Sequence, residues 1–275
     1  MKRIPRLLIF SFLVIFSPDL SGQVYKLVSW NIQHFGKTKD TREIEVMANS
    51  LKDADFVAIQ EVVAGYGGSQ AVARLIEELN LRGASWEYMI SDPTQSSPQT
   101  REKYAFLWKK HKVKPLGRAT LDKNFEEEIN REPYRGRFLF GGKELTIFSF
   151  HARPKQSQPE REIKYVKFFP RIYPDEALIF LGDFNLPQKH TVFNPIKKMG
   201  YKAALINQKT SLKKKFAENR QYLANPLDNI FFHPEEIRAL DSGVIDFTLE
   251  MDDLSEANQV SNHLPVYLVF ELLQK

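Results

Sequence analysis

Several residues that could bind a cation or move a proton stand at the ends of short apolar segments. They are Glu61 after D-F-V-A-I-Q, His151 after F-S-F, Asp183 and Asn185 in F-L-G-D-F-N, Asp228 before N-I-F-F, and Asn262 with His263 before L-P-V. A carboxylate at the mouth of an apolar strand costs free energy unless it is paired or bound to a cation. If these ends converge, they would form a hard-oxygen metal site beside two histidines that can serve as acid and base.

Each of these residues alone also has a simpler structural explanation. A carboxylate can end a strand in solvent, an Asp with a following Asn can form an Asx-type turn, and a histidine can fill an ordinary strand or turn position. Asn31 could likewise just close the first strand. Only their joint occurrence, in this order along one chain, favours a reactive site.

The elements that would position these residues alternate between short apolar runs and amphipathic stretches. We expect strands at 25–30, 55–61, 86–90, 104–108, 113–116, 137–140, 145–150, 177–181, 229–232, 244–247 and 265–272. Asp40 and Glu43 resemble a capping box for one helix, Ser69 can cap a second, and Pro159 fits the first turn of a third. Because strands outnumber helices and often come in consecutive pairs, the pattern favours mixed sheets covered by helices.

Two consecutive strand pairs carry specific expectations. The strands at 104–108 and 113–116 are expected to be neighbours joined by a basic turn. The strands at 137–140 and 145–150 are expected to form a hairpin around Gly141 and Gly142.

The composition of the 275 residues excludes several classes of protein. With 43% hydrophobic residues the chain is too apolar for a disordered protein, and with 13 Gly and 15 Pro it is not fibrous. The absence of Cys excludes a disulfide scaffold, a thiolate metal site and a cysteine nucleophile. The length suits one large domain or two small ones, and no linker rich in Ser, Gly or Pro divides the chain.

Residues 1–22 differ from the rest of the chain. Lys2, Arg3 and Arg6 precede an apolar run at 7–16, and small or helix-breaking residues follow it. This layout is typical of a secretory signal peptide, and the run is half the length of a membrane-spanning helix, which needs about 20 residues. We therefore expect an exported protein, periplasmic or secreted, whose domain spans residues 23–275 and is not inserted in a membrane.

Six motifs, in order, resemble the endonuclease/exonuclease/phosphatase superfamily, and within it type I deoxyribonuclease. They are S-W-N-I-Q-H-F-G (29–36), D-F-V-A-I-Q-E (55–61), R-E-K-Y-A-F-L-W (101–108), R-E-P (131–133), F-L-G-D-F-N (180–185) and S-N-H-L-P-V (261–266). The similarity extends over residues 24–272. It implies a four-layer α/β sandwich, in which two packed mixed β-sheets are flanked by helices. It also implies phosphodiester hydrolysis with a divalent cation, usually Mg²⁺, with Mn²⁺ or Ca²⁺ as alternatives.

The same resemblance implies how the site would hold its cation and its nucleophile. Glu61 would bind the metal with help from Asn31, and Asn262 would offer a carbonyl ligand. Asp183 and Asn185 would position the nucleophile and the non-bridging phosphate oxygens.

The two histidines would form the acid and base pair of the implied mechanism. Glu102 would orient His151 and Asp228 would orient His263, and the resemblance leaves open which histidine is the base. Arg131 would contact the substrate phosphate, and its alternative is an ordinary surface arginine.

The chain departs from the family pattern at several positions. Asn262 stands where the family has an aspartate, so the site loses a full negative charge. Val63 and Thr100 replace an arginine and a tyrosine that grip duplex DNA in deoxyribonuclease. Two basic stretches could compensate: 101–118 holds seven Lys/Arg and one acid, and 197–220 holds eight and one acid. Either stretch could attract phosphates or could simply be a solvated face.

Three functions remain open from the sequence. The first is an exported, monomeric endonuclease that hydrolyses DNA. The second is a phosphodiesterase or phosphatase acting on lipid or inositol phosphates. The third is a binding protein with weakened catalysis, for which Asn262 is the support.

Overall fold

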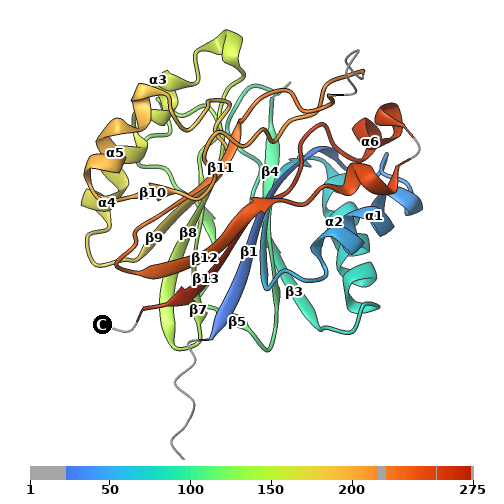
Figure 1. The fold of residues 1–275 in the computed structure, drawn as a ribbon, viewed down its shortest axis with the longest axis horizontal. Coiled ribbons are helices and arrows are strands. Elements are labelled where there is room, and N and C mark those ends of the chain that lie inside the picture. Colours follow the sequence, from blue (N-terminus) through green and yellow to red (C-terminus); the bar gives the residue numbers. More distant parts are fainter. Residues whose placement is uncertain (1–22, 99, 216–220, 252, 274–275) are drawn as a thin grey trace, which may run out of the picture.

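The computed structural model describes residues 23–98, 100–215, 221–251 and 253–273 of the chain (Figure 1). Residues 1–22, for which we expect a signal peptide, lie outside this range, as does the end of the second basic stretch (216–220). Within the described ranges, no helix is both long enough and apolar enough to cross a bilayer.

In the described ranges, thirteen strands form two mixed sheets. The first sheet has the order β12-β13-β1-β2-β4-β3, formed by β1 (Val24–Phe35), β2 (Phe56–Val63), β3 (Trp86–Ile90), β4 (Glu102–Lys109), β12 (Ile237–Val244) and β13 (Val266–Leu272). The second has the order β10-β11-β9-β8-β7-β5, with β6 paired to β7, formed by β5 (Val113–Pro115), β6 (Thr120–Leu121), β7 (Tyr134–Phe140), β8 (Lys143–His151), β9 (Leu178–Asp183), β10 (Lys202–Ala203) and β11 (Asp228–Phe232).

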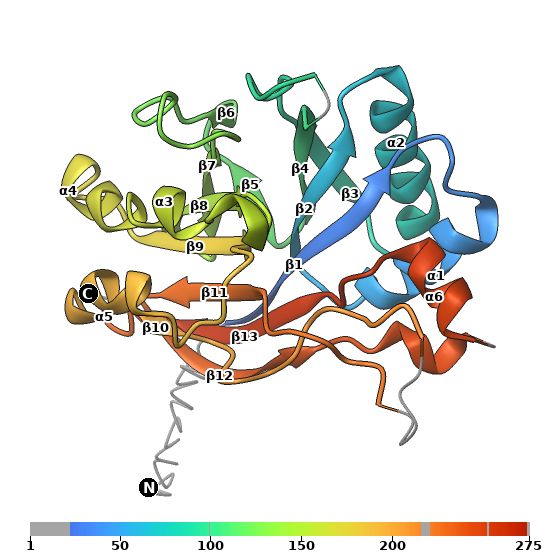
Figure 2. The same cartoon turned by 90° about the horizontal axis from the view of Figure 1, so that it is seen from above.

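Helices cover the outer faces of both sheets (Figure 2). The first sheet is covered by α1 (Thr41–Leu51), α2 (Tyr66–Asn80) and α6 (Leu254–Val260), and the second by α3 (Glu160–Ile163), α4 (Phe169–Ile172) and α5 (Asn194–Lys198). Short 3₁₀ helices lie at Lys155–Ser157, Val166–Phe168, Thr191–Phe193 and Phe247–Glu250. This arrangement is the expected four-layer sandwich.

Three apolar clusters hold the layers together. The middle cluster lies between the sheets and is rich in aromatic rings, such as Phe56 against Phe138 with centroids 4.7 Å apart. The outer clusters join each sheet to its own helices. Because both faces of each sheet are covered, the central strands consist of nearly continuous apolar residues.

Local sequence signals explain most element boundaries. The predicted capping box is confirmed: Glu43 N–H donates to Asp40 Oδ1, and Asp40 N–H donates to Glu43 Oε2, each at 2.8 Å. The hairpin of β7 and β8 around Gly141 and Gly142 is also confirmed. Helix α2 begins at Tyr66, before the predicted Ser69, and its N-cap Gly65 has an extended backbone and no side-chain capping hydrogen bond.

One predicted pairing is wrong. Strands β4 and β5 follow each other in sequence but belong to different sheets, since β4 pairs with β2 and β3 whereas β5 pairs with β7. The basic turn at 110–112 therefore carries the chain from one sheet to the other. Alternating apolar residues indicate that both are strands, but they carry no information on which strand each one pairs with.

Parallel strands bring the candidate residues to one edge of the molecule. β1 runs parallel to β2, and β8 runs parallel to β9, so the carboxyl ends of these four strands point the same way. β4 and β11 are antiparallel to their neighbours and start at this edge, with Glu102 and Asp228 as their first residues. His263 lies three residues before the start of β13, at the same edge.

Candidate active site

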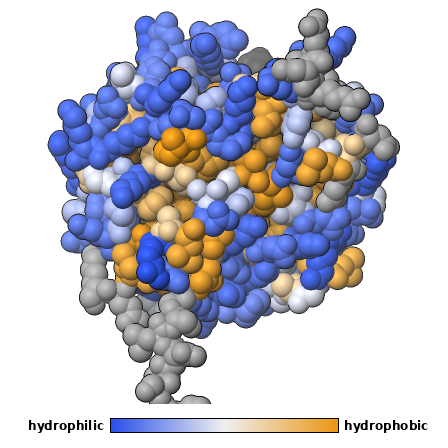
Figure 3. All heavy atoms as spheres, in the orientation of Figure 1, coloured by the Kyte–Doolittle hydropathy of each residue, from blue (hydrophilic) through white to orange (hydrophobic). Residues whose placement is uncertain are grey.

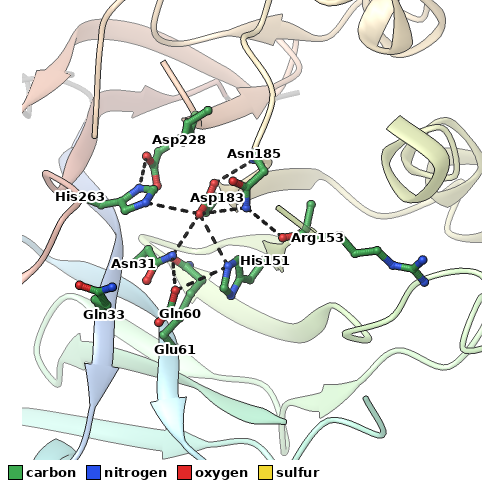
Figure 4. Close-up of polar contacts among 12 residues, drawn as sticks. Asn31, Gln33, Gln60, Glu61, His151, Arg153, Asp183, Asn185, Asp228 and His263 are labelled. Atoms are coloured by element: carbon green, nitrogen blue, oxygen red, sulfur yellow. Dashed lines mark hydrogen bonds and ion pairs between the residues drawn. The ribbon is translucent and has the colours of Figure 1, made fainter. Parts of the chain in front are cut away.

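Nine of the ten predicted site residues gather where the edges of the two sheets meet, and most are labelled in Figure 4. Asp183 lies in the middle of the group, with a histidine on each side of it (Figure 4). Its carboxylate Oδ2 is 3.7 Å from Nε2 of His151 and 3.7 Å from Nε2 of His263. Two imidazoles from different sheets therefore face the same oxygen atom.

His151 is held by a buried carboxylate. Its Nδ1 lies 2.8 and 2.9 Å from the two carboxylate oxygens of Glu102. Both residues are at most 7% exposed. Because Nδ1 is engaged with Glu102, the free Nε2 is directed toward Glu61 Oε1 and Asp183, each at 3.7 Å.

Arg131 contacts both members of the Glu102–His151 pair. Its Nε lies 3.0 Å from Glu102 Oε2, and its Nη1 donates to the backbone carbonyls of His151 and Ala152 at 3.4 Å. Only 8% of Arg131 is exposed, so it is not the ordinary surface arginine that the sequence left as an alternative. Its geometry fixes the end of β8, on which the orientation of His151 depends.

His263 has an equivalent carboxylate partner. Its Nδ1 lies 2.8 Å from Oδ2 of Asp228, and the same oxygen accepts a hydrogen bond from the Thr210 hydroxyl at 2.6 Å. The backbone of His263 is also fixed, because its carbonyl accepts from the Trp30 indole N–H at 2.8 Å and its N–H donates to Ser261 Oγ at 3.1 Å. The imidazole is therefore constrained at both its ring and its main chain.

The electrostatics of the site favour protonated histidines. Burial opposes the positive charge on His263, but the carboxylates of Asp228 and Asp183 outweigh it and raise the pKa of His263 to about 10. Burial also opposes the charge on His151, and Glu102 more than offsets this, so the pKa of His151 is raised. Burial raises the pKa of Asp183, with Asp228 acting in the same direction and the two histidines opposing.

Special backbone conformations place the acidic residues. Gly182 has φ 131°, and a Cβ at this position would lie 2.0 Å from the Phe150 carbonyl oxygen, so only glycine lets β9 lie this close to β8. Asn185 and Glu61 have φ 50° and 61°, a left-handed conformation that is uncommon away from glycine. At Asn185 the backbone N–H donates to Asp183 Oδ1 at 2.8 Å and the side chain donates to the Ala152 carbonyl at 3.0 Å.

The oxygen-rich side of the site fits a hard divalent cation. Asn31 Nδ2 donates to Glu61 Oε1 and to Asp183 Oδ2, both at 3.0 Å, while Asn31 Oδ1 is buried with no hydrogen-bond partner among the described residues. A buried carbonyl oxygen without a partner is costly unless something binds it. With the Glu61 carboxylate beside it, the donor set consists of oxygens, which Mg²⁺, Mn²⁺ and Ca²⁺ prefer.

A second acidic group offers metal-binding atoms as well. Potential ligand atoms of Asp183, Asp228 and His263 lie within 4.8 Å of one another. However, Nδ1 of His263 is engaged with Asp228 Oδ2, and the same oxygen accepts a hydrogen bond from Thr210, so this group has fewer atoms free to bind a cation. The group around Glu61 and Asn31 is therefore the better cation site.

Asn262 is the predicted residue whose side chain is not joined to the others by a hydrogen bond. Its Oδ1 is buried and, within the described part of the chain, has no hydrogen-bond partner, whereas its backbone carbonyl accepts from Leu212 N–H at 2.7 Å. The structure thus places a second unsatisfied amide oxygen next to His263, where a cation or water could bind it.

Sequence reasoning missed Thr210. It belongs to no motif and lies 18 residues before Asp228, yet its hydroxyl contacts that carboxylate. Arg153, which follows the site in sequence, points away from it (Figure 4), and its Nε contacts Glu162 Oε1 at 2.7 Å. No local sequence pattern distinguishes Thr210, which contacts a site residue, from Arg153, which points away from the site.

The fold and the buried carboxylate–histidine pairs define the class of protein, a hydrolase of phosphoester bonds. The chain belongs to the Endonuclease/Exonuclease/phosphatase family, whose profile matches residues 28–263.

Curated relatives include deoxyribonucleases. The chain is 27% identical over 279 residues to "Deoxyribonuclease" of Thioalkalivibrio sp. (strain K90mix), covering 94% of this chain and 74% of that protein. It is 26% identical over 176 residues to "Deoxyribonuclease-1" of Bos taurus, covering 60% of this chain and 61% of that protein.

Solved structures share the fold at low identity. An endonuclease/exonuclease/phosphatase family protein from Bacteroides thetaiotaomicron has a TM-score of 0.67 at 14% identity, covering 92% of this chain and all of that one. A mannosyl-6-phosphatase from the same species has a TM-score of 0.62 at 15% identity, covering 91% of this chain and all of that one. These neighbours establish the architecture and leave the substrate to be argued from the site.

Proposed function

We propose that this protein is a divalent-metal-dependent phosphodiesterase, and specifically an exported endonuclease that hydrolyses DNA with Mg²⁺. The observation that carries the proposal is the pair of buried histidines, each tied to its own carboxylate at 2.8 Å and each directed at Asp183. The relative named deoxyribonuclease, which aligns with 94% of this chain, supports DNA as the substrate.

A bound cation would neutralise charge on the phosphate and lower the pKa of a coordinated water. Glu61 and Asn31 would hold this cation, with Asn262 as a further carbonyl ligand. Their oxygens are suitable, because Oδ1 of each asparagine is buried without a partner among the described residues.

The two histidines divide the proton transfers of hydrolysis. One Nε2 takes a proton from the attacking water and the other protonates the leaving oxygen, while Asp183 and Asn185 orient the water and the phosphate. Glu102 and Asp228 keep each ring in place through Nδ1, so that Nε2 is the atom presented to the substrate. Both assignments of base and acid satisfy this geometry.

The test is an assay of the purified protein on plasmid DNA, RNA, sphingomyelin, a sugar phosphate and a generic phosphodiester, with Mg²⁺, Mn²⁺ or EDTA. We expect nicking and linearisation of the plasmid with Mg²⁺ and none with EDTA. His151→Ala should lower the rate by about 10²- to 10⁴-fold, the usual contribution of acid–base catalysis. His111→Ala is the matched control, because His111 is exposed in the turn between β4 and β5.

Other outcomes would select the alternative functions. Cleavage of a lipid or of a phosphomonoester without cleavage of DNA would identify a phosphatase or lipid phosphodiesterase. On the face seen in Figure 3, apolar areas alternate with hydrophilic ones. Metal-independent DNA binding without any hydrolysis would identify a binding protein.

We also propose that the protein is exported to the periplasm or the medium and acts as a monomer. Residues 1–22 support export, because a basic start followed by a ten-residue apolar run is typical of a signal peptide. Mass spectrometry of the protein recovered from fractionated cells tests this, since an intact Met1 on the recovered protein would contradict signal cleavage.

A further inference from the structure

The connection between β10 and β11 carries lysines to the edge of the active site. Lys209 and Lys214 are exposed, and Lys213 is half-buried. None of Lys209, Lys213, Lys214 and Lys215 forms an ion pair with an acidic residue in the described ranges. These four residues are called the lysine segment below.

Contacts in the middle of this connection fix the lysine segment beside His263. Ser211 forms an isolated β-bridge with His263, and Leu212 N–H donates to the Asn262 carbonyl at 2.7 Å. The backbone carbonyl of Lys213 accepts from Asn258 Nδ2 at 3.0 Å, which adds a contact to α6. Since a chain extends at most about 3.6 Å per residue, Lys215 starts within about 11 Å of Leu212.

The lysines at 109–114 of the other basic stretch lie far from the site, whereas Lys103 directly follows Glu102 at the start of β4. β4 starts at Glu102 and ends at Lys109, and the seven steps between them, at about 3.3 Å each, place that end roughly 23 Å away. In Figure 1 the turn before β5 and the connection before β11 lie at opposite ends of the molecule. Lys110 is also paired with Glu87 at 3.0 Å, so its charge is partly neutralised. The two stretches look alike in sequence but differ in position.

We propose that the lysine segment binds the phosphates of a polynucleotide on the His263 side of the scissile bond, and so selects a polymeric substrate over a small phosphate ester. This rests on the proposed nuclease function and extends it. Ammonium groups without acidic partners are suited to a backbone with one phosphate per nucleotide, because binding releases counterions. A small ester has a single phosphate, which already occupies the catalytic centre and leaves nothing for the lysine segment to bind.

The first test measures binding without hydrolysis. In EDTA, the affinity of the full-length protein for a short labelled DNA duplex is measured by fluorescence anisotropy between about 50 and 200 mM NaCl. We expect K213Q/K214Q/K215Q to reduce the slope of log K against log salt by about 2 to 3, since each lost phosphate contact removes about 0.9. The matched control K110Q/K112Q/K114Q removes the same charge from the distant turn and should keep the slope.

The second test compares substrates in the presence of Mg²⁺. The ratio of kcat/KM for plasmid DNA to kcat/KM for bis(p-nitrophenyl) phosphate should fall by at least about tenfold in K213Q/K214Q/K215Q, mainly through KM for the plasmid. The control variant should keep the wild-type ratio. An unchanged ratio and an unchanged salt slope in the lysine-segment variant would overturn the proposal.

The outcomes separate the two proposals. If the wild-type protein cleaves no DNA, the proposed function fails first. If it cleaves DNA and the two triple variants behave alike, only the role of the lysine segment fails. Binding to phosphatidylserine vesicles that depends on the lysine segment, with DNA affinity unaffected, would assign the segment to a membrane surface and also overturn the proposal.

Discussion

Replacement of Asp228 by Asn should change how the stability of the metal-free protein depends on pH. The substitution keeps the shape of the side chain but removes the charge that lies 2.8 Å from His263 Nδ1. Because the folded pKa of His263 is raised from 6.5 to about 10, the wild-type protein gains stability from this group below about pH 6.5 and loses it as pH rises toward 10.

The size of the stability change follows from the pKa shift of His263. A difference of about 3.5 pKa units corresponds to about 5 kcal/mol in full, of which about 3 kcal/mol is lost between pH 7 and 9.5. In D228N the two contributions of Asp228 are lost and only those of Asp183 and Glu61 still raise the pKa of His263, so we expect the loss over the same range to be less than about half of that.

The measurement is urea unfolding in EDTA at several pH values from about 7 to 9.5, for wild type, D228N and H263Q. Other titrating groups contribute similarly to all three proteins, so the difference between their slopes isolates His263. H263Q removes the titrating ring and should show the flattest dependence. Equal slopes in wild type and D228N would show that the Asp228–His263 pair is not the source of the raised pKa.

Three further predictions concern the metal, the backbone and the family difference at Asn262. Mg²⁺ at 100 times its Kd should stabilise the wild-type protein by about 2.7 kcal/mol in a thermal shift assay, and Glu61→Gln should remove most of this gain. Gly182→Ala should cost about 3 kcal/mol or more in urea unfolding, because its Cβ would meet the Phe150 carbonyl at 2.0 Å, whereas Gly117→Ala, where φ is 91° and the space is open, should cost only about 1 to 2 kcal/mol. Asn262→Asp should raise the cleavage rate and lower the Mg²⁺ concentration required, and a rate no faster at any Mg²⁺ concentration would contradict the importance of this charge.

The positions of most catalytic candidates could be predicted because they lie at or near the end of a buried strand, as Glu102, His151, Asp183 and Asp228 do. Apolar runs mark such strands reliably, and polar residues interrupting them must be satisfied by partners, as Glu102 satisfies His151. The cap of the first helix was also readable, since Asp40 and Glu43 form a local motif that needs no distant contact, whereas the cap expected at Ser69 was wrong. The six ordered motifs then indicated the family, and the fold of that family implies the four layers.

The remaining features depend on contacts between residues distant in sequence. Thr210 reaches Asp228 from a connection without apolar periodicity, and β5 leaves the sheet of β4 although only three residues separate them. The burial of Arg131 was not readable either, because its carbonyl partners come from two other segments. Side-chain type and spacing do not encode such contacts.

Each carboxylate–histidine pair joins one sheet to the other. Glu102 on the first sheet holds His151 on the second, Asp228 on the second sheet holds His263 at the start of the first sheet's β13, and Asn31 and Asp183 bridge the sheets as well. Neither sheet therefore carries a working pair by itself. A partly unfolded form in which the two sheets have separated would therefore keep none of these contacts, so the site exists only while the aromatic layer between the sheets is closed.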